Sequence, residues 1–457
     1  MLTALRQHRD RFPDATAIRA GTAAGWQDTT WAELYDATLA TATFAKDVRG
    51  VVVTVLDGSA ASIATVLGLI AAGVDVLPLE EKSSYLTDPG SPVHTLEVST
   101  VVGPGEYAGF RSPPATEPDP GRESEILQVT SGSTGEPRIA RQPLRNVLHG
   151  AHSYRRVFGI GEGDVVLATV PLAHSFGFIG GLGTALVSGA TLVTLTRFNP
   201  RQVLGALADG VTMMLGTPLV YRLLSPLLRG EPPRPRIVLS SGGPLAPELA
   251  TEAGARLGSP VRQIYGSTET GLIACHPASA QRWPEGSAGV PAPDVETRIG
   301  EGGRLFVRTP ALFAGYAGGA PVTVDEDGFY DTGDLAVSVE GYLFLKGRKE
   351  TFINVGGRKV NPRRIERVLS GHPGVREAFV FGADSAGAGA EQEIHAAVVL
   401  TPDTRVDELV AFCRAQHLMP YEVPHRLHPF TALPRTGMGK INRRQVIATA
   451  TSKGSHG

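Results

Sequence analysis

The stretch LQVTSGSTGEPRIAR, residues 127–141, decides how the rest of the chain is interpreted. A short apolar run of β type leads into residues 130–135, which contain two glycines and four hydroxyl side chains. Glycines let such a loop bend tightly, so its N–H groups and hydroxyls can surround an anion, and Arg138 adds a fixed positive charge. The GxxxxGK[ST] pattern is absent, so a P-loop kinase or GTPase is not indicated. By itself the stretch also fits an ordinary turn or linker.

The composition describes a globular protein of more than one domain. A chain of 457 residues predicts two or three units, and its formal net charge of -2 offers no basic surface for nucleic acid or an anionic membrane. Two distant cysteines, Cys275 and Cys413, indicate neither a disulfide framework nor a metal cluster and fit a reducing cytoplasm. The N-terminus lacks a signal-peptide pattern, and no apolar run approaches the roughly 18–20 residues of a membrane span.

The hydrophobic pattern predicts an α/β fold. A strand at 51–56, a helix at 59–73 and a strand at 74–79 form a βαβ unit, and residues 165–195 form a second one. Such units predict parallel sheets covered by helices. A further helix begins after Thr30, which with a glutamate three residues later resembles a capping box, and Phe44 belongs to its expected apolar side.

Successive strands end in loops rich in glycine and proline. The transitions lie within residues 165–175, 211–218, 236–245 and 261–271. Ligands of open parallel sheets bind where the carboxyl ends of strands meet. We therefore expect these four loops to share one crevice.

The C-terminal third has a different texture. Short β-type segments after Gly286 predict a β-rich subdomain. Beyond it we expect a small α+β domain with helices at 362–370 and near 405–417, strands near 376–382 and 394–400, and a disordered end.

Five stretches, in this order along the chain, resemble the motifs of one protein family. They are SGSTGEPR (131–138), YGSTETG (265–271), YDTGDLA (330–336), GRKETFINVGGRKVNPRRIE (347–366) and PRTGMGKINR (434–443). Each is weak to moderate alone, but together they identify the chain as similar to the adenylate-forming, or AMP-binding, superfamily. That family comprises acyl- and aryl-CoA synthetases, peptide-synthetase adenylation domains and luciferases.

The resemblance implies a domain division and a two-step reaction. It divides the chain into an adenylation core (1–347), a hinge (348–350) and a small mobile C-terminal domain (351–457). A carboxylic acid and ATP, with Mg²⁺, would give an acyl-adenylate and pyrophosphate. A thiol of coenzyme A or of carrier-protein phosphopantetheine would then take the acyl group. The expected protein is a cytoplasmic monomer or homodimer that binds a small carboxylic acid, and a carrier protein as a further possible partner, but neither nucleic acid nor membrane.

The family pattern assigns nucleotide-binding roles to residues of the first three motifs and their surroundings. The β- and γ-phosphates would lie on the 130–135 loop beside Arg138, which stands where the family usually has lysine. Glu269 and Thr134 would hold Mg²⁺, and Asp334 the ribose, although T-G-D is also common turn chemistry. The full nucleotide set is Thr130, Ser131, Gly132, Ser133, Thr134, Gly135, Arg138, Ser241, Gly242, Gly243, Tyr265, Gly266, Ser267, Asp334 and Arg348.

The catalytic assignments follow the same pattern. Lys440 would bridge the carboxylate and the α-phosphate, which Thr268 also contacts. His174 would position the acid, although a lone histidine beside an apolar run is more often a packed residue. Glu350 stands at the hinge, where aspartate or lysine is usual. The pair Gly356 and Gly357 would shape the pantetheine tunnel.

The acid itself is only partly specified. The segment 174–181 lacks the aspartate of relatives that activate amino acids, so the acid should have no α-amino group. A mostly apolar pocket for an aryl or acyl group would be lined by Phe176, Phe178, Gly181, Gly216, Thr217, Gly243, Ile264 and Leu272. The alternatives are an amine acceptor and a catalytically silent relative that binds nucleotide or acyl ligand.

Overall fold

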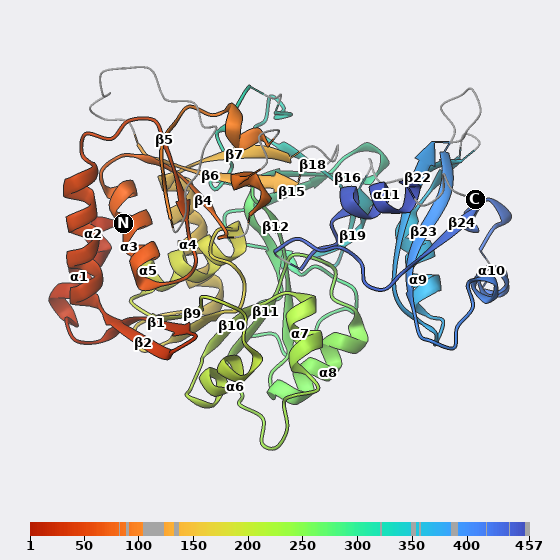
Figure 1. The fold of residues 1–457 in the computed structure, drawn as a ribbon, viewed down its shortest axis with the longest axis horizontal. Coiled ribbons are helices and arrows are strands. Elements are labelled where there is room, and N and C mark those ends of the chain that lie inside the picture. The colour runs from red at the N-terminus through yellow and green to blue at the C-terminus, as the bar shows by residue number, and fades with distance from the viewer. Residues whose placement is uncertain are drawn as a thin grey trace.

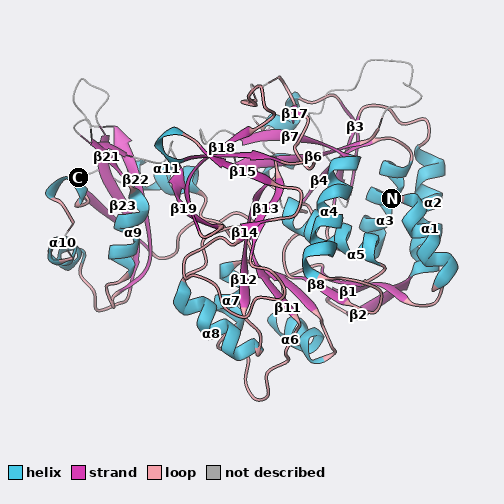
Figure 2. Ribbon diagram, turned by 180° about the vertical axis from the view of Figure 1, so that it is seen from behind, coloured by secondary structure: helices cyan, strands magenta, loops and turns pink. Residues whose placement is uncertain are grey.

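The protein is described by a computed structural model covering residues 1–81, 83–87, 91–103, 123–131, 137–319, 322–348, 353–355, 358–384, 392–416, 418–437 and 439–452. A large lobe holds two mixed sheets and their helices, and a small lobe at one end of the long axis holds the C-terminal elements (Figure 1). The view from behind shows the same separation (Figure 2). Among the described helices, none combines the length and the apolar character that crossing a membrane requires.

The larger sheet has nine strands in the order β14-β13-β12-β11-β10-β8-β9-β1-β2. Strands β12, β11, β10 and β8 pair in parallel, so their carboxyl ends lie at one edge, as the four loop transitions predict. The hairpin β1–β2 was not predicted, and it joins the sheet through β9. The strands are β1 (Thr16–Thr22), β2 (Gly25–Thr30), β8 (Val165–Ala168), β9 (Thr191–Leu195), β10 (Met213–Gly216), β11 (Ile237–Ser240), β12 (Val261–Ser267), β13 (Gly271–Cys275) and β14 (Val290–Pro291).

The second sheet has six strands in the order β17-β7-β6-β4-β3-β5. The first predicted βαβ unit is confirmed here, because β3 and β4 pair in parallel with α3 between them along the chain. The stretch that opened the sequence analysis forms the antiparallel hairpin of β6 and β7. The strands are β3 (Val51–Val55), β4 (Asp75–Leu79), β5 (Val98–Val102), β6 (Glu125–Ser131), β7 (Pro137–Pro143) and β17 (Gly315–Tyr316).

The two sheets share a hydrophobic core. Side chains of one sheet (Val52, Val76) and of the other (Val166, Met213) belong to one buried cluster with helices α3, α4 and α5. Neighbouring residues of the central strands, such as Leu167 beside Val166 and Met214 beside Met213, belong to a second cluster under α6, α7 and α8, as the period of two requires. The helices of the large lobe are α1 (Leu2–Arg11), α2 (Trp31–Ala45), α3 (Ala60–Ala71), α4 (Leu144–Phe158), α5 (Thr184–Ser188), α6 (Pro200–Ala208), α7 (Pro218–Leu224) and α8 (Pro247–Leu257).

Helix α2 begins as its sequence predicts but buries a different face at its end. The Thr30 side chain accepts from the Glu33 N–H, and the Glu33 carboxylate accepts from the Thr30 N–H, which completes the capping box. Leu34 and Thr38 are buried as expected. Phe44 is 88% exposed, so its assignment to the apolar side was wrong: the helix rotates it past the stripe that packs on α3.

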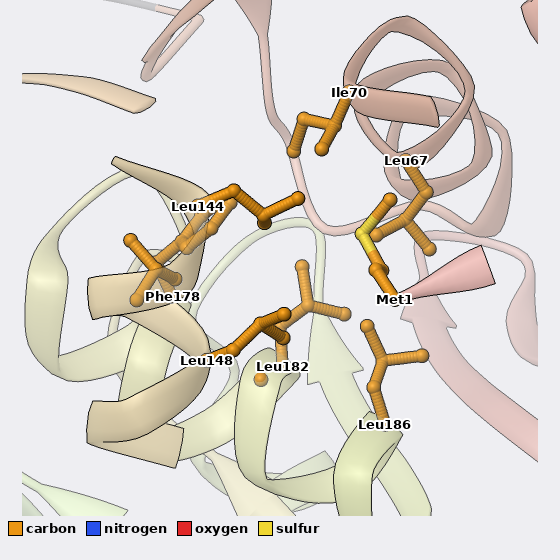
Figure 3. Close-up of a pocket in the computed structure, with 10 residues that line it drawn as sticks. Met1, Leu67, Ile70, Leu144, Leu148, Phe178, Leu182 and Leu186 are labelled. Atoms are coloured by element: carbon orange, nitrogen blue, oxygen red, sulfur yellow. The ribbon is translucent and has the colours of Figure 1, made fainter. Parts of the chain in front are cut away.

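The second βαβ unit contains a π-helix, η3 (Phe176–Gly183), before α5. Four glycines in these eight residues permit close packing, and a Cβ on Gly177 would collide with the backbone carbonyl of Pro171. A cavity of about 20 Å³ lies between η3, α3, α4 and Met1 (Figure 3). Its lining is entirely apolar, and such a space is too small for a substrate and stays dry.

The remaining strands form three small sheets. The predicted β-rich subdomain is the antiparallel sheet β15-β16-β18-β19. The small lobe contains the pair β20-β21 and the sheet β22-β23-β24, and α9 coincides with the helix predicted at 362–370. The predicted disordered end is TSKGSHG, 451–457. Its first two residues close helix α11, so the prediction was wrong for them, and 453–457 lie outside the described residues. These elements are β15 (Glu296–Ile299), β16 (Arg304–Arg308), β18 (Tyr330–Val339), β19 (Tyr342–Arg348), β20 (Ile353–Val355), β21 (Arg358–Val360), β22 (Val375–Asp384), β23 (Gln392–Leu400), β24 (Arg426–Phe430), α9 (Pro362–Ser370), α10 (Val406–Ala415) and α11 (Arg443–Ser452).

A buried histidine follows β13. The His276 ring stacks on Trp283 with 4.2 Å between ring centroids, and its Nε2 lies 3.0 Å from the Ser287 hydroxyl. Burial, with Arg262 acting in the same direction, lowers the pKa of His276 from 6.5 to about 4. The folded protein therefore holds this ring neutral at a pH where the unfolded chain protonates it.

We expect acid to destabilise the protein through His276. Its contribution is complete above pH 6.5 and is lost as the pH falls toward about 4, with a total of up to about 3 kcal/mol in the free energy of unfolding. Urea unfolding of the native protein and of His276→Gln, at several pH values across this window, measures the difference. Parallel pH dependences of the two proteins would contradict the expectation.

Candidate functional site

The site begins at the end of the β6–β7 hairpin. Thr130 pairs with Arg138, and Ser131 with Pro137, so the predicted phosphate loop closes a hairpin. Thr130 is buried, and its hydroxyl donates to the carbonyl of Arg138 at 3.5 Å. Residues Gly132, Ser133, Thr134 and Gly135 and the Ser131 side chain lie outside the described part. Arg138 therefore stands at the inner end of a strand, directly after this loop.

The turn between β12 and β13 carries Thr268 to the same place. The Ser175 hydroxyl lies 3.0 Å from the Thr268 hydroxyl and 2.6 Å from Gln128 Oε1. Gln142 donates its amide N–H to the carbonyl of Thr268. Both glutamines are buried and belong to the hairpin. A buried polar network thus joins the six-stranded sheet to the turn of the nine-stranded sheet.

Glu269 is held from two directions. The Tyr316 hydroxyl donates to Glu269 Oε1 at 2.9 Å, and the Phe313 N–H donates to the Glu269 carbonyl at 2.8 Å. Burial raises the pKa of Tyr316 well above its ordinary value, and the negative charge of Glu269 raises it further. The phenol therefore stays protonated and remains a donor to the carboxylate.

The residues assigned to the nucleoside also meet. Tyr265, at the end of β12, donates its hydroxyl to Asp334 Oδ2 at 2.7 Å. The Asp334 N–H donates to the Thr332 hydroxyl, so the turn chemistry weighed from the sequence is present beside the possible ribose role. Ser241, Gly242 and Gly243 follow the neighbouring strand β11 and are half-buried, and Gly242 has φ of 89°. Gly266 and Ser267 complete the end of β12.

His174 lies where the large lobe meets the C-terminal loop. Its Nε2 is 2.8 Å from Oε1 of Glu80, the residue that follows β4. A Cβ on Gly437 would collide with the Glu80 carboxylate, and one on Gly439 would lie 2.8 Å from Leu219. The loop that carries the exposed Lys440 therefore packs against the Glu80–His174 pair.

The same loop is fixed to the small lobe. Arg435 donates to the carbonyl of Gly439 at 2.7 Å and to Glu377 of β22 at 2.7 Å. Glu377 also lies 3.7 Å from Arg222 of α7. One carboxylate thus connects the Lys440 loop, the small lobe and the large lobe.

The predicted acid pocket divides into two groups. Phe176 and Gly181 of η3, with Ile264 and Leu272, are buried near the strand ends. Gly216 packs on the Tyr221 ring, and the Thr217 hydroxyl caps α7, so these side chains serve local packing as well. Phe178 borders the apolar cavity at α4, and no other predicted pocket residue does, all of them being described (Figure 3). Its role in binding the acid stays a prediction.

Several predicted residues cannot be located in this arrangement. The Arg348 side chain, Glu350, Gly356 and Gly357 lie outside the described residues. The backbone of Arg348 pairs with Asp334 across β18 and β19.

Glu80, Gln128, Gln142, Ser175 and Tyr316 are among the residues of the site that were not identified from the sequence. A usable signal existed for Gln128, because a glutamine inside an apolar strand must find buried partners. Tyr316 had none, since the sequence does not show that its strand pairs with β7.

A magnesium ion has a suitable ligand here. Tyr316 occupies one side of the Glu269 carboxylate, and a single carboxylate that shares the ion with nucleotide phosphates is a usual Mg²⁺ arrangement. Among the described residues, no three His, Cys, Asp or Glu side chains gather as a metal-binding group. The residues present fit a shared ion rather than a protein-enclosed one.

Family models match two segments of the chain. Residues 84–317 match the AMP-binding enzyme, and residues 364–440 match the AMP-binding enzyme C-terminal domain. The chain resembles 2-succinylbenzoate–CoA ligase of Bacillus licheniformis, with 31% identity over 338 residues, 71% of this chain and 70% of that protein. Oxalate–CoA ligase of Arabidopsis thaliana is 28% identical over 397 residues, 81% of this chain and 74% of that protein. Matches with these and other curated relatives cover 66% to 74% of the relatives' own length.

Two solved structures are similar to this protein over nearly the whole chain. O-succinylbenzoate coenzyme A synthetase from Bacillus subtilis, in complex with AMP, has a TM-score of 0.77 at 27% identity and covers 97% of both chains. The same enzyme in complex with ATP and magnesium ion has a TM-score of 0.76 at 28% identity, covering 97% of this chain and 99% of that chain. The chain belongs to the AMP-binding enzyme family, the adenylate-forming superfamily that its motifs resemble, and it is an AMP-forming acid–thiol ligase.

Proposed function

We propose that the chain joins an aryl or acyl carboxylic acid without an α-amino group to coenzyme A, at the expense of ATP. The observation that carries this proposal is the docking of the Lys440 loop on the Glu80–His174 pair. This places the loop beside the segment whose Ser175 contacts Thr268. Curated relatives named as CoA ligases support coenzyme A as the acceptor.

The proposed first step forms a mixed anhydride. A carboxylate oxygen of the acid bonds to the α-phosphorus of ATP, and the bond from that phosphorus to the bridging oxygen of pyrophosphate breaks. Lys440 and Thr268 would stabilise the charge that develops on the α-phosphate, and Arg138 that on the leaving pyrophosphate. Mg²⁺ on Glu269 and Thr134 would neutralise phosphate charge during this step.

The proposed second step transfers the acyl group to sulfur. The coenzyme A thiol loses its proton to solvent, the thiolate bonds to the acyl carbon, and the bond from that carbon to the phosphate oxygen breaks, so that AMP leaves with the bonding electrons. We propose that residues 348–350 form the hinge between the core (1–347) and the small domain (351–457). Gly356 and Gly357 would then border the pantetheine arm.

The acid and the nucleoside would lie on opposite sides of the α-phosphate. Tyr265 and the 241–243 loop would enclose adenine, and Asp334 would accept the ribose hydroxyls. The acid pocket is proposed to consist of Phe176, Phe178, Gly181, Gly216, Thr217, Gly243, Ile264 and Leu272 around His174. None of these pocket side chains is charged, so an uncharged acyl or aryl body is favoured.

The direct test is exchange of labelled pyrophosphate into ATP that depends on an added acid. A panel of aryl acids, short- and medium-chain acids, dicarboxylic acids and amino acids would be compared, followed by coenzyme A consumption with the active acid. The proposal is supported if exchange occurs only with an acid that carries no charge apart from its reacting carboxylate, and if that acid also leads to coenzyme A consumption. Exchange with amino acids, or none with any acid in folded protein that binds ATP, would refute it.

We expect Glu377→Gln to lower pyrophosphate exchange about fivefold, because a partly exposed ion pair contributes about 1 kcal/mol. Loss of this carboxylate releases Arg435 and Arg222 together. Thioester formation from supplied acyl-adenylate should change less than twofold. Asp407→Asn, on the exposed start of α10, serves as the control for loss of an acidic side chain. An equal effect on both half-reactions would contradict the positioning role of Glu377.

A further inference from the structure

Tyr316 touches both charged side chains assigned to the phosphate end of the nucleotide. The Arg138 guanidinium carbon lies over the Tyr316 ring, 5.2 Å from its centroid. The hydroxyl of the same ring donates to Glu269 at 2.9 Å. One side chain therefore separates the cation from the carboxylate and contacts each with a different part of its surface.

The backbone fixes where this ring lies. Tyr316 pairs with Ala140 in the short strand β17, so it is carried by the same sheet as Arg138. Phe313 packs edge-on against the Tyr316 ring with 4.8 Å between centroids. Because the Phe313 N–H also holds the Glu269 carbonyl, the segment 313–316 fixes both the ring and the backbone of the carboxylate residue.

The arginine at position 138 suits this ring. A guanidinium is planar and weakly hydrated, so it stacks on an aromatic face while its edge N–H groups stay available to phosphate oxygens. The phenol hydroxyl binds one carboxylate oxygen of Glu269, which orients the other oxygen for an ion shared with nucleotide. The two contacts are made by chemically distinct parts of one side chain, and substitutions can separate them.

We propose that Tyr316 is a positioning residue with two separable actions: its ring orients Arg138 for the phosphates, and its hydroxyl orients Glu269 for Mg²⁺. This inference rests on the proposed nucleotide site. It also explains why arginine at position 138 suits this chain, because the Tyr316 ring offers a face on which a guanidinium stacks.

The test compares Tyr316→Phe, which keeps the ring, with Tyr316→Leu, which loses both ring and hydroxyl. Calorimetry measures ATP affinity without acid, first in chelator and then across a Mg²⁺ titration. Without metal, the ATP affinity of Tyr316→Phe should stay within twofold of native. The factor by which Mg²⁺ raises that affinity should be about tenfold smaller than in the native protein, because a hydrogen bond to a charged group is lost. Tyr316→Leu should also lose about fivefold of the metal-free affinity.

Further variants connect these effects to their partners. Glu269→Gln added to Tyr316→Phe should reduce the Mg²⁺ gain no more than Glu269→Gln alone, since both changes act on one contact. Tyr342→Phe, on strand β19, is the matched control for removing a phenol hydroxyl, and thermal unfolding checks the fold of every variant.

Two results would overturn the inference: an unchanged Mg²⁺ gain in Tyr316→Phe, or equal losses of metal-free affinity in the two Tyr316 variants. Failure of the proposed function is distinguishable, because native protein would then bind ATP without exchanging pyrophosphate with any acid. In that case the ATP affinities of the native protein and the two Tyr316 variants can still be compared.

Discussion

Lys440→Ala should lower acid-dependent pyrophosphate exchange by about 10²–10³-fold, the usual effect of removing one donor to transition-state charge. The side chain is exposed and its loop packs on the Glu80–His174 pair, so the change removes a charge without opening a core. Thioester formation from supplied acyl-adenylate should stay within about threefold of the native rate. Rapid-quench measurement of each half-reaction separates the two.

A nearby cation supplies the control for Lys440. Arg444→Ala removes an exposed positive charge four residues along the chain, at the start of α11, and should leave both half-reactions within twofold. Equal losses of the two half-reactions in Lys440→Ala would assign this lysine to a general or structural role. Retention of exchange would remove it from the first step altogether.

Gly266→Ala should abolish tight ATP binding, with a loss of about 100-fold or more. A Cβ at this position would collide with the backbone carbonyl of Gly271. Because the contact is with backbone, no side-chain rotation can relieve it. The strand β12 or the turn that carries Thr268 and Glu269 must therefore move. A displacement of about 1 Å in such a site costs about 10²-fold in rate.

Gly205→Ala is the matched control, because a Cβ there meets no atom within 4 Å and the residue lies in helix α6. It should keep native ATP affinity and gain slightly in stability. Calorimetry with ATP and thermal unfolding would be applied to both variants. Native affinity in a folded Gly266→Ala protein would show that the turn tolerates displacement.

The parts of the fold that were predictable have strong local signals. Helix α9 occupies the predicted range 362–370, and the Thr30 capping box forms as expected. The parallel pairing of β12, β11, β10 and β8 agrees with the shared edge that the repeated strand-to-glycine transitions predict. Phe44 shows the limit of this approach, because an apolar residue near a helix end has no periodic neighbour to fix its direction.

The parts that were not predictable depend on long-range pairing. The β6–β7 hairpin carries the predicted phosphate loop. No local signal shows that β17, more than 170 positions later, adds to its edge and brings Tyr316 to Arg138. Glu80 reaches His174 only because the two sheets share a core. Motifs therefore located the chemistry, and tertiary contacts supplied the residues that orient it.

The interface between the lobes sets a timescale. Arg222 is 55% exposed where it meets Glu377, and glycines of the Lys440 loop lie against Glu80 and Leu219. An exposed pair worth about 1 kcal/mol or less biases an open–closed equilibrium by no more than about fivefold. Domain motions commonly take microseconds to milliseconds, whereas a typical enzyme turns over about ten times per second. We therefore expect the proposed motion of the small lobe to be fast relative to one catalytic cycle, so that bond chemistry or product release, and not undocking, limits the rate.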